Sequence, residues 1–140
     1  MGAGKRFSAR VSAGDDPAKA SLAALIAAED FATDEDLDAR VRARLAVVVE
    51  ELVSNAVRHG AQGGPIALEL GMTVNADEIA IMLEDDGIAF DPTQDRGFSG
   101  PDAKSGGGVG LALVRAWTTA FRYDRVNDRN RLELRLRLVS

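Results

Sequence analysis

Helical and extended segments do not alternate along this chain of 140 residues. Its apolar patterning predicts the order β-α-α-β-β-loop-α-β-β, in which one strand twice follows another directly. A doubly wound parallel sheet needs a helix between successive strands, so the order argues against that fold class. We expect the α+β class: a two-layer α/β sandwich whose mixed, mostly antiparallel sheet is covered on one face by helices.

Five strands are predicted from alternating side chains. Residues 5–12 alternate apolar and polar and predict a half-buried edge strand. The runs 66–74 and 78–84 flank a short turn and predict a hairpin. Residues 121–126 and 131–139 predict a second hairpin around the polar segment 127–130. The last strand would place four leucines inward: Leu132, Leu134, Leu136 and Leu138.

The first predicted helix covers residues 18–31 and follows an acidic start with a proline. Its large apolar side chains recur at helical spacing, so we expect them to face the core: Leu22, Leu25 and Ile26.

The second predicted helix opens at the capping-box-like run 33–36, so it would begin at Asp34 or Glu35. We expect it to end at His59, with Gly60 in the left-handed conformation that stops many helices.

A polar stripe runs along this second helix. Glu51, Asn55 and His59 are spaced i, i+4 and i+8, and successive members drift only ~40° around the axis, so they share one face. The stripe could be the solvated side of an amphipathic helix. However, asparagine is a poor helix former, and a specific hydrogen bond or metal coordination explains it better.

The end of the predicted strand 78–84 suggests binding chemistry. Asp85 ends an apolar strand, and Gly87 allows a sharp turn after it. A buried carboxylate there needs a donor, such as the amino group of a nucleobase, although an ordinary Asp-Gly turn is the simpler alternative.

Glycines 106–108 and Gly110 precede a predicted apolar helix, residues 109–119. Its free N–H groups suit a phosphate, with a flexible linker as the alternative interpretation. The cluster is not a Walker A loop, because no Lys-Ser or Lys-Thr follows.

Composition excludes several classes of protein. There is no cysteine and only one histidine, which argues against disulfide scaffolds and multi-histidine zinc sites. The net charge of −5 argues against nucleic-acid binding. No apolar run approaches the ~20 residues of a membrane span, and no signal-peptide core opens the chain. We therefore expect a single cytoplasmic domain over residues 1–140.

The three motifs occur in an order that resembles the GHKL ATPase superfamily, whose nucleotide-binding fold is the Bergerat fold. Residues 51–56 look like its N box, Asp85–Gly87 like its first glycine box and Gly108–Gly110 like its second. Residues 90–107 would be the ATP lid. The runs ELVSNAVRHG and DDGIAFDP are most similar to the anti-sigma-factor serine/threonine kinase group of bacteria.

This resemblance implies a role for each motif residue. Asn55 would coordinate Mg²⁺, Glu51 would be the general base, and Asp85 would hold the adenine amino group of ATP, with Gly87 beside the base. The backbone of the second glycine box would meet the phosphates: Gly108, Val109 and Gly110. His59 would contact phosphate or lid, or simply finish its helix. Lys104 or Arg96 would reach the γ-phosphate. Ala89 departs from the pattern, because many relatives have a second glycine there.

The implied activity is that of an ATP- and Mg²⁺-dependent protein-serine kinase. Its substrate would be a STAS-type anti-sigma antagonist, and a sigma factor is a possible second partner of what would be a homodimer. The alternative is a nucleotide-gated binding module that sequesters a regulator without catalysis. A histidine-kinase fragment is disfavoured by the length of the chain and by Glu51.

Overall fold

The computed structural model describes residues 4–11, 15–16, 18–60, 65–94 and 107–138, and of residues 94 and 107–109 it describes the backbone only. The elements follow the predicted order, with a π-helical turn and a 3₁₀ turn added. They are β1 (Lys5–Val11), α1 (Ala18–Asp34), α2 (Ala39–Asn55), the π-helix η1 (Ala56–Gly60), β2 (Ile66–Asn75), β3 (Glu78–Asp85), the 3₁₀ helix η2 (Pro92–Gln94), α3 (Gly107–Trp117), β4 (Thr118–Val126) and β5 (Arg129–Arg137).

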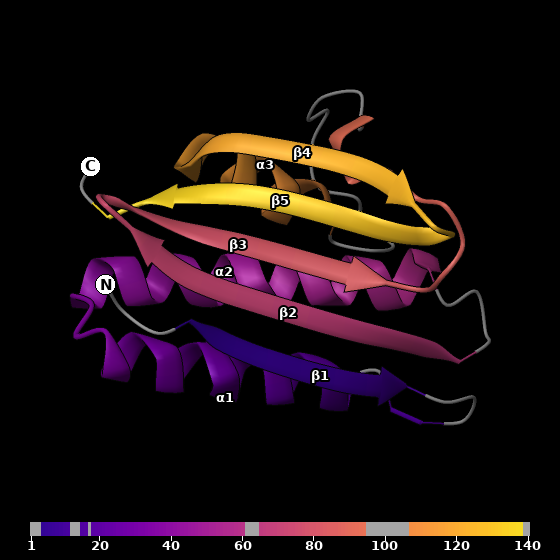
Figure 1. Cartoon of the computed structure of the whole chain (residues 1–140), viewed down its shortest axis with the longest axis horizontal. Helices are drawn as coiled ribbons and strands as arrows, with labels where there is room; N and C mark the ends of the chain where they lie inside the picture. The colour runs from indigo at the N-terminus through magenta and orange to yellow at the C-terminus, as the bar shows by residue number, and fades with distance from the viewer. Residues whose placement is uncertain (1–3, 12–14, 17, 61–64, 95–106, 139–140) are drawn as a thin grey trace.

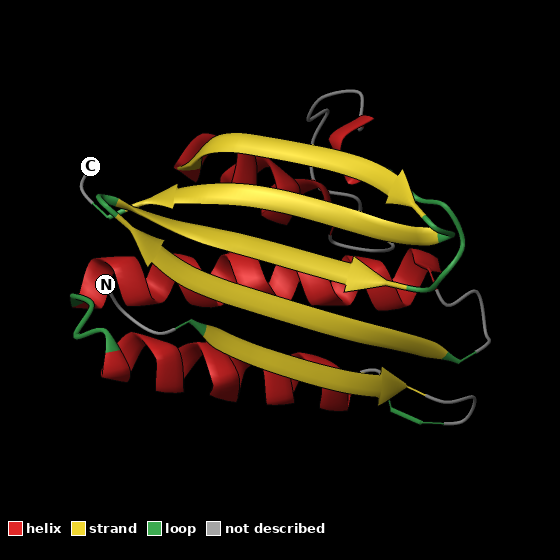
Figure 2. Ribbon diagram, in the orientation of Figure 1, coloured by secondary structure: helices red, strands yellow, loops and turns green. Residues whose placement is uncertain are grey.

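The strands form one sheet in the order β1-β2-β3-β5-β4. Every pairing is antiparallel. All three α-helices lie behind the sheet and leave its other face open (Figures 1 and 2). The predicted fold class is therefore confirmed, and β1 is the edge strand that its alternating pattern indicated.

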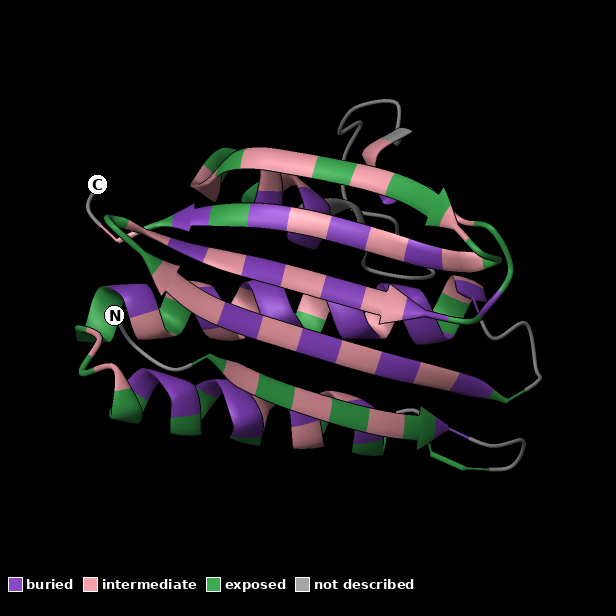
Figure 3. Cartoon of the chain, in the orientation of Figure 1, coloured by how far each residue is buried: buried purple, intermediate pink, exposed green. Residues whose placement is uncertain are grey.

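The core lies between the sheet and the helices. Buried and partly buried residues alternate along β2, β3 and β5 (Figure 3), as strands with one covered face require. Three of the four predicted inward leucines of β5 are buried, Leu132, Leu134 and Leu136, and Leu138 packs against them from a half-buried position.

Helix α1 turns a different face inward from the one expected. Leu22 and Ile26 are 61% and 56% exposed, and Leu25 is only half-buried, so the prediction of an inward leucine stripe was wrong. Small residues occupy the buried face instead, together with Phe31: Ala20, Ala24, Ala27 and Ala28. An alanine face lets α1 lie close to α2 and the sheet, where leucines would not fit.

The burial pattern of α1 predicts different effects on stability for two substitutions in this helix. Leu22→Ala should change the free energy of unfolding by no more than about 0.5 kcal/mol, as expected for a surface position. Ala24→Leu should cost about 1–3 kcal/mol, because Ala24 is fully buried and has no space for a larger side chain. Urea unfolding of both variants measures the difference, and a larger loss for Leu22→Ala would contradict the observed face.

Helix α2 begins later than predicted. The run 33–36 does not open it, because α1 continues to Asp34 and Asp36 has a φ of 54° in the connection. Asp38 is the N-cap instead, and its carboxylate accepts a hydrogen bond from the Val41 N–H at 2.9 Å. The acidic run 34–36 and the single residue Asp38 are both cap candidates, and Asp38, which is nearer the apolar stripe of α2, caps the helix.

The β4–β5 hairpin is tighter than the predicted turn 127–130. Asn127 and Asp128 have φ values of 52° and 62°, as in the two-residue turns that match the twist of a hairpin. β5 therefore begins at Arg129, and Asn130 falls on the same face as the buried leucines. This shift places a polar side chain inside the domain.

Candidate functional site

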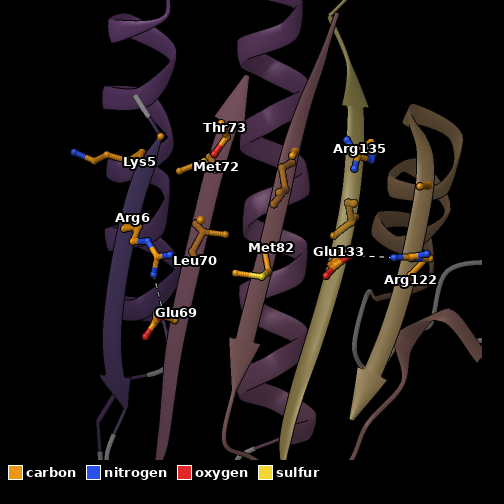
Figure 4. Close-up of a pocket in the computed structure, with 16 residues that line it drawn as sticks. Lys5, Arg6, Glu69, Leu70, Met72, Thr73, Met82, Arg122, Glu133 and Arg135 are labelled. Carbon is orange, nitrogen blue, oxygen red and sulfur yellow. Dashed lines mark hydrogen bonds and ion pairs between the residues drawn. The ribbon is translucent and has the colours of Figure 1, made fainter. Parts of the chain in front are cut away.

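A hollow on the open face of the sheet has a volume of about 750 Å³ (Figure 4). Cross-strand ion pairs lie along it, Arg6 with Glu69 at 3.5 Å and Arg122 with Glu133 at 3.2 Å. None of the predicted polar site residues lines it. We therefore place the site elsewhere, on the covered side of the sheet.

A small pocket between α2, β3, β5 and α3 brings predicted site residues together. Asn55, Asp85 and Asn130 supply its polar groups among apolar and glycine residues: Leu52, Ala56, Gly60, Phe90, Pro92, Leu111 and Leu132. Its volume is about 10 Å³, about the space of one water molecule. Polar groups that converge in an apolar pocket are typical of a ligand site, and this one must open before it can take a nucleobase.

The end of α2 positions Glu51 and Asn55 one turn apart. Asn55 is 3% exposed, and its amide donates to the Glu51 carbonyl at 2.8 Å and to the Glu51 carboxylate at 3.4 Å. Arg58 donates to Asn55 Oδ1 at 2.8 Å. Asn55 is thus held by specific hydrogen bonds, as its presence in a helix suggested, and this stripe is not simply a solvated face.

The Glu51 carboxyl group lies against the first turn of α3. A Cβ atom added to Gly110 would overlap the carboxyl carbon and both carboxylate oxygens of Glu51. Only glycine fits at this position while the carboxylate stays where it is. The second glycine box therefore meets the N box directly, a contact that the sequence did not predict.

Burial raises the pKa of Glu51 above its ordinary value. The Arg58 guanidinium and the hydrogen bond from Asn55 oppose this shift, while neighbouring Glu50 adds to it. A carboxylate with a raised pKa is a stronger base than an exposed one, which suits a proton acceptor.

A close backbone contact joins η1 to the first glycine box. The Ile88 N–H donates to the Gly60 carbonyl at 2.9 Å. A Cβ atom on Gly87 would approach that carbonyl oxygen to 2.5 Å. Gly60 itself is not in the left-handed region, so the prediction of a left-handed stop was wrong. Its role is close packing, since a Cβ there would lie 3.0 Å from Ile66 Cδ1.

Gly87→Ala should therefore destabilise the domain by about 1–3 kcal/mol, because the new methyl group meets backbone atoms that cannot rotate away. Gly71→Ala is the matched control: it lies on β2, and a Cβ there meets nothing within 4 Å. Thermal unfolding of both variants measures the contrast. Equal stability of the two would contradict the contact between Gly87 and Gly60.

Asp85 is fixed at the end of β3 by two donors. The Gly87 N–H and the Asn130 side-chain amide each donate to its Oδ1 at 2.9 Å. Burial raises the pKa of Asp85, and these two hydrogen bonds partly offset the rise. Sequence reasoning missed Asn130, which is 4% exposed. The available signal was its position two residues before Leu132 on an otherwise apolar strand face.

His59 lies in the π-helical turn η1, which follows α2 directly. Its ring stacks on Phe90 with centroids 4.2 Å apart. Burial, and secondarily Arg58, lowers the pKa of His59, which favours the neutral ring. His59 thus contacts the residue at which the predicted lid begins, and Phe90 in turn lines the pocket.

Several predicted residues lie outside what the structure describes. Residues 95–106 of the predicted lid, with Arg96 and Lys104, are among them. Gly108 and Val109 are described only as backbone in the first turn of α3. Their proposed phosphate contacts therefore stay predictions.

Residues 15–136 match the model of the histidine kinase-like ATPase domain. The chain belongs to this family. A curated relative of this ATPase domain, the serine/threonine-protein kinase BtrW of Bordetella bronchiseptica, is 34% identical over 112 residues, which cover 76% of this chain and 78% of the relative. The resemblance to the GHKL ATPases is thereby confirmed.

Solved structures support the fold of this ATPase domain. The histidine kinase domain of a blue-light activated histidine kinase from Erythrobacter litoralis aligns with a TM-score of 0.52 and 19% identity. The match covers 70% of this chain but only 45% of that one. Histidine kinase AdeS of Acinetobacter baumannii aligns with a TM-score of 0.51 and 19% identity, over 96% of this chain and 68% of its own.

No helix in the described part of this ATPase domain is long and apolar enough to cross a membrane.

Proposed function

We propose that this ATPase domain is an ATP-dependent protein-serine kinase that acts as an anti-sigma regulatory factor. The observation that carries the proposal is the Glu51 carboxylate, which is partly buried, has a raised pKa and lies between Asn55 and the first turn of α3. The name of the relative, a serine/threonine-protein kinase, supports the same reaction class.

In the proposed reaction the hydroxyl oxygen of a serine attacks the γ-phosphorus of ATP. The bond from that phosphorus to the bridging oxygen breaks, ADP leaves, and Glu51 accepts the hydroxyl proton. Phosphoryl transfer depends mostly on positioning and charge stabilisation, so few side chains are needed. Asp85 would receive the amino group of adenine in the small pocket, and the backbone at the start of α3 would meet the phosphates.

A magnesium ion fits this site only with help from the nucleotide. No cluster of three or more carboxylate or histidine side chains is present in the described residues. Asn55 Oδ1 is a hard oxygen ligand, and Mg²⁺ usually combines one or two protein oxygens with substrate phosphates and water. Asn55 would hold the ion, provided that Arg58, which now donates to that oxygen, moves away.

The substrate we propose is a STAS-type anti-sigma antagonist, in a partner-switching pathway in which a homodimer of this chain also binds a sigma factor. The net charge of −5 favours a protein partner over nucleic acid. A second candidate is a nucleotide-gated binding module without catalysis. One observation favours it: Arg58 occupies the oxygen of Asn55 that would hold Mg²⁺.

The deciding experiment incubates the full chain with γ-labelled ATP, Mg²⁺ and candidate STAS proteins. Label on a serine that disappears with Glu51→Ala supports the kinase. Tight ATP binding without transfer to any candidate supports the binding module. A chain that binds no ATP would overturn both proposals.

The role of Arg58 can be tested by the pH dependence of transfer. Glu51 accepts a proton only when ionised, so the rate falls as the pH drops below its pKa. Arg58 holds that pKa down, and Arg58→Ala should move the acidic limb of the pH–rate profile to higher pH. Arg58→Lys keeps the positive charge and should move the acidic limb less. A limb that stays in place in both variants would mean that Arg58 does not set the pKa of the titrating base.

A further inference from the structure

Asn130 is the most extensively hydrogen-bonded side chain of the site. Its Nδ2 donates to Asp85 Oδ1 at 2.9 Å and to the Ile88 carbonyl at 2.8 Å. Its Oδ1 accepts from the Tyr123 hydroxyl at 2.6 Å, from Arg125 at 3.0 Å and from the Phe90 N–H at 3.3 Å. Both donors and the acceptor of this amide are therefore engaged by the protein.

Three donors decide which way the amide points. An asparagine side chain carries an acceptor and a donor group at nearly equal positions, and only its surroundings distinguish the two orientations. With the amide reversed, the NH₂ group would face the donors of Tyr123, Arg125 and Phe90, and Oδ1 would face the Asp85 carboxylate. Tyr123 and Arg125 on β4 thus enforce the orientation that gives Asp85 its donor.

The orientation of Asn130 in turn decides what Asp85 offers to a ligand. Both donors to Asp85 converge on Oδ1, and Oδ2 receives no hydrogen bond from a described residue. No fully buried side-chain oxygen or nitrogen among the described residues is without a partner, so Oδ2 is accessible. An accessible carboxylate oxygen accepts hydrogen bonds and donates none, which selects a ligand that carries an N–H group.

We propose that Tyr123 and Arg125 are positioning residues that make this pocket selective for a purine with a 6-amino group. The proposal rests on the proposed binding of ATP and adds residues outside the three motifs. Neither residue touches the base: both act through Asn130, and the positive charge of Arg125 also lowers the pKa of Asp85. Arg125 also donates to the Gly87 carbonyl at 2.9 Å, so it holds the turn that follows Asp85.

Arg125 is well suited to a test because its side chain lies outside the hydrophobic core. It is exposed and makes no ion pair with a residue of the described structure. Tyr123→Phe keeps the ring and removes only the hydroxyl. Arg122→Ala is a matched control, because Arg122 is an exposed arginine on the same strand that pairs with Glu133 on the open face of the sheet.

The test compares the affinities of the full chain for ATP and for purine riboside triphosphate, which lacks only the 6-amino group, by calorimetry. The wild-type chain should prefer ATP about tenfold or more, the value of one hydrogen bond to a charged acceptor. This preference should fall about two- to tenfold in Arg125→Ala and in Tyr123→Phe, and further in the double variant. Arg122→Ala should keep it.

A merely structural role would lower both affinities together and leave their ratio unchanged, which would overturn the proposal. A wild-type chain that binds both nucleotides equally would overturn it as well, while leaving the proposed ATP-dependent function in place. A wild-type chain that binds neither would overturn the proposed function itself and this inference with it.

Discussion

Replacing Glu51 by glutamine should lower the rate of phosphoryl transfer by about 10²- to 10⁴-fold, the usual contribution of a positioned general base. Glutamine keeps the size of the side chain and an oxygen for the Asn55 amide, which now donates to the carboxylate at 3.4 Å. It cannot accept the proton of a serine hydroxyl. ATP should therefore still bind with an affinity within a few fold of the wild-type value.

Single-turnover transfer of labelled phosphate measures the rate, and calorimetry measures the affinity for ATP. Glu50→Gln is the matched control, because Glu50 is the adjacent carboxylate, is exposed and lies ~100° away around the helix. It should leave transfer nearly unchanged. Comparable losses in both variants would indicate that overall charge matters and that Glu51 is not the base.

Asp85→Asn should lower the affinity for ATP by about 100-fold or more without lowering the stability of the fold. The hydrogen bonds from Gly87 and Asn130 hold one oxygen of residue 85, so the new NH₂ group would occupy the position of the accessible oxygen. It would then face the amino group of adenine, donor against donor. A polar pair left unmatched in this way is among the strongest sources of discrimination in a binding site.

The stability of Asp85→Asn follows from the sign of the pKa shift. Burial raises the pKa of Asp85, so the folded chain favours the protonated carboxyl group more than the unfolded chain does. That preference stabilises the fold below the unfolded pKa and is lost as the pH rises through the folded pKa. At neutral pH the ionised group works against folding, and a neutral asparagine should leave the melting temperature equal or higher.

Asp86→Asn provides the control for this pair of measurements. Asp86 is the next carboxylate along the chain, is exposed, and accepts a hydrogen bond from the Ala67 N–H at 2.7 Å. The Asp86→Asn variant should bind ATP with an affinity within a few fold of the wild-type value. A lower melting temperature for Asp85→Asn at neutral pH, or an unchanged affinity for ATP, would contradict the proposed role of Asp85.

Much of the fold could be predicted because strand periodicity here is strong. The leucines of β5 and the alternating runs of β2 and β3 fix a sheet with one covered face. Helix faces were harder to predict. In α1 a leucine stripe and an alanine stripe both have helical spacing, and hydrophobicity alone favours the leucines. The alanines are buried because the close approach of α1 leaves room only for small side chains.

The site could be predicted where its chemistry is local. Glu51 and Asn55 share one helix, and Asp85 and Gly87 share one turn. What escaped prediction depends on contacts between distant segments. Asn130 was assigned to a turn, and only the two-residue geometry at Asn127 and Asp128 turns it inward. The meeting of Gly110 with Glu51 likewise requires the packing of α3 against α2.

The strand order β1-β2-β3-β5-β4 has a consequence for the folding kinetics of this domain. β2–β3 and β4–β5 are hairpins that close over short turns, whereas β1–β2 and β3–β5 join segments far apart in the chain. Asp85 and Asn130 face each other on the β3–β5 junction, 45 residues apart. Contacts of high sequence separation carry the largest loop-closure cost and tend to form late. A nucleobase bound at Asp85 would therefore hold the two hairpins together, and we expect it to stabilise the domain chiefly by slowing unfolding.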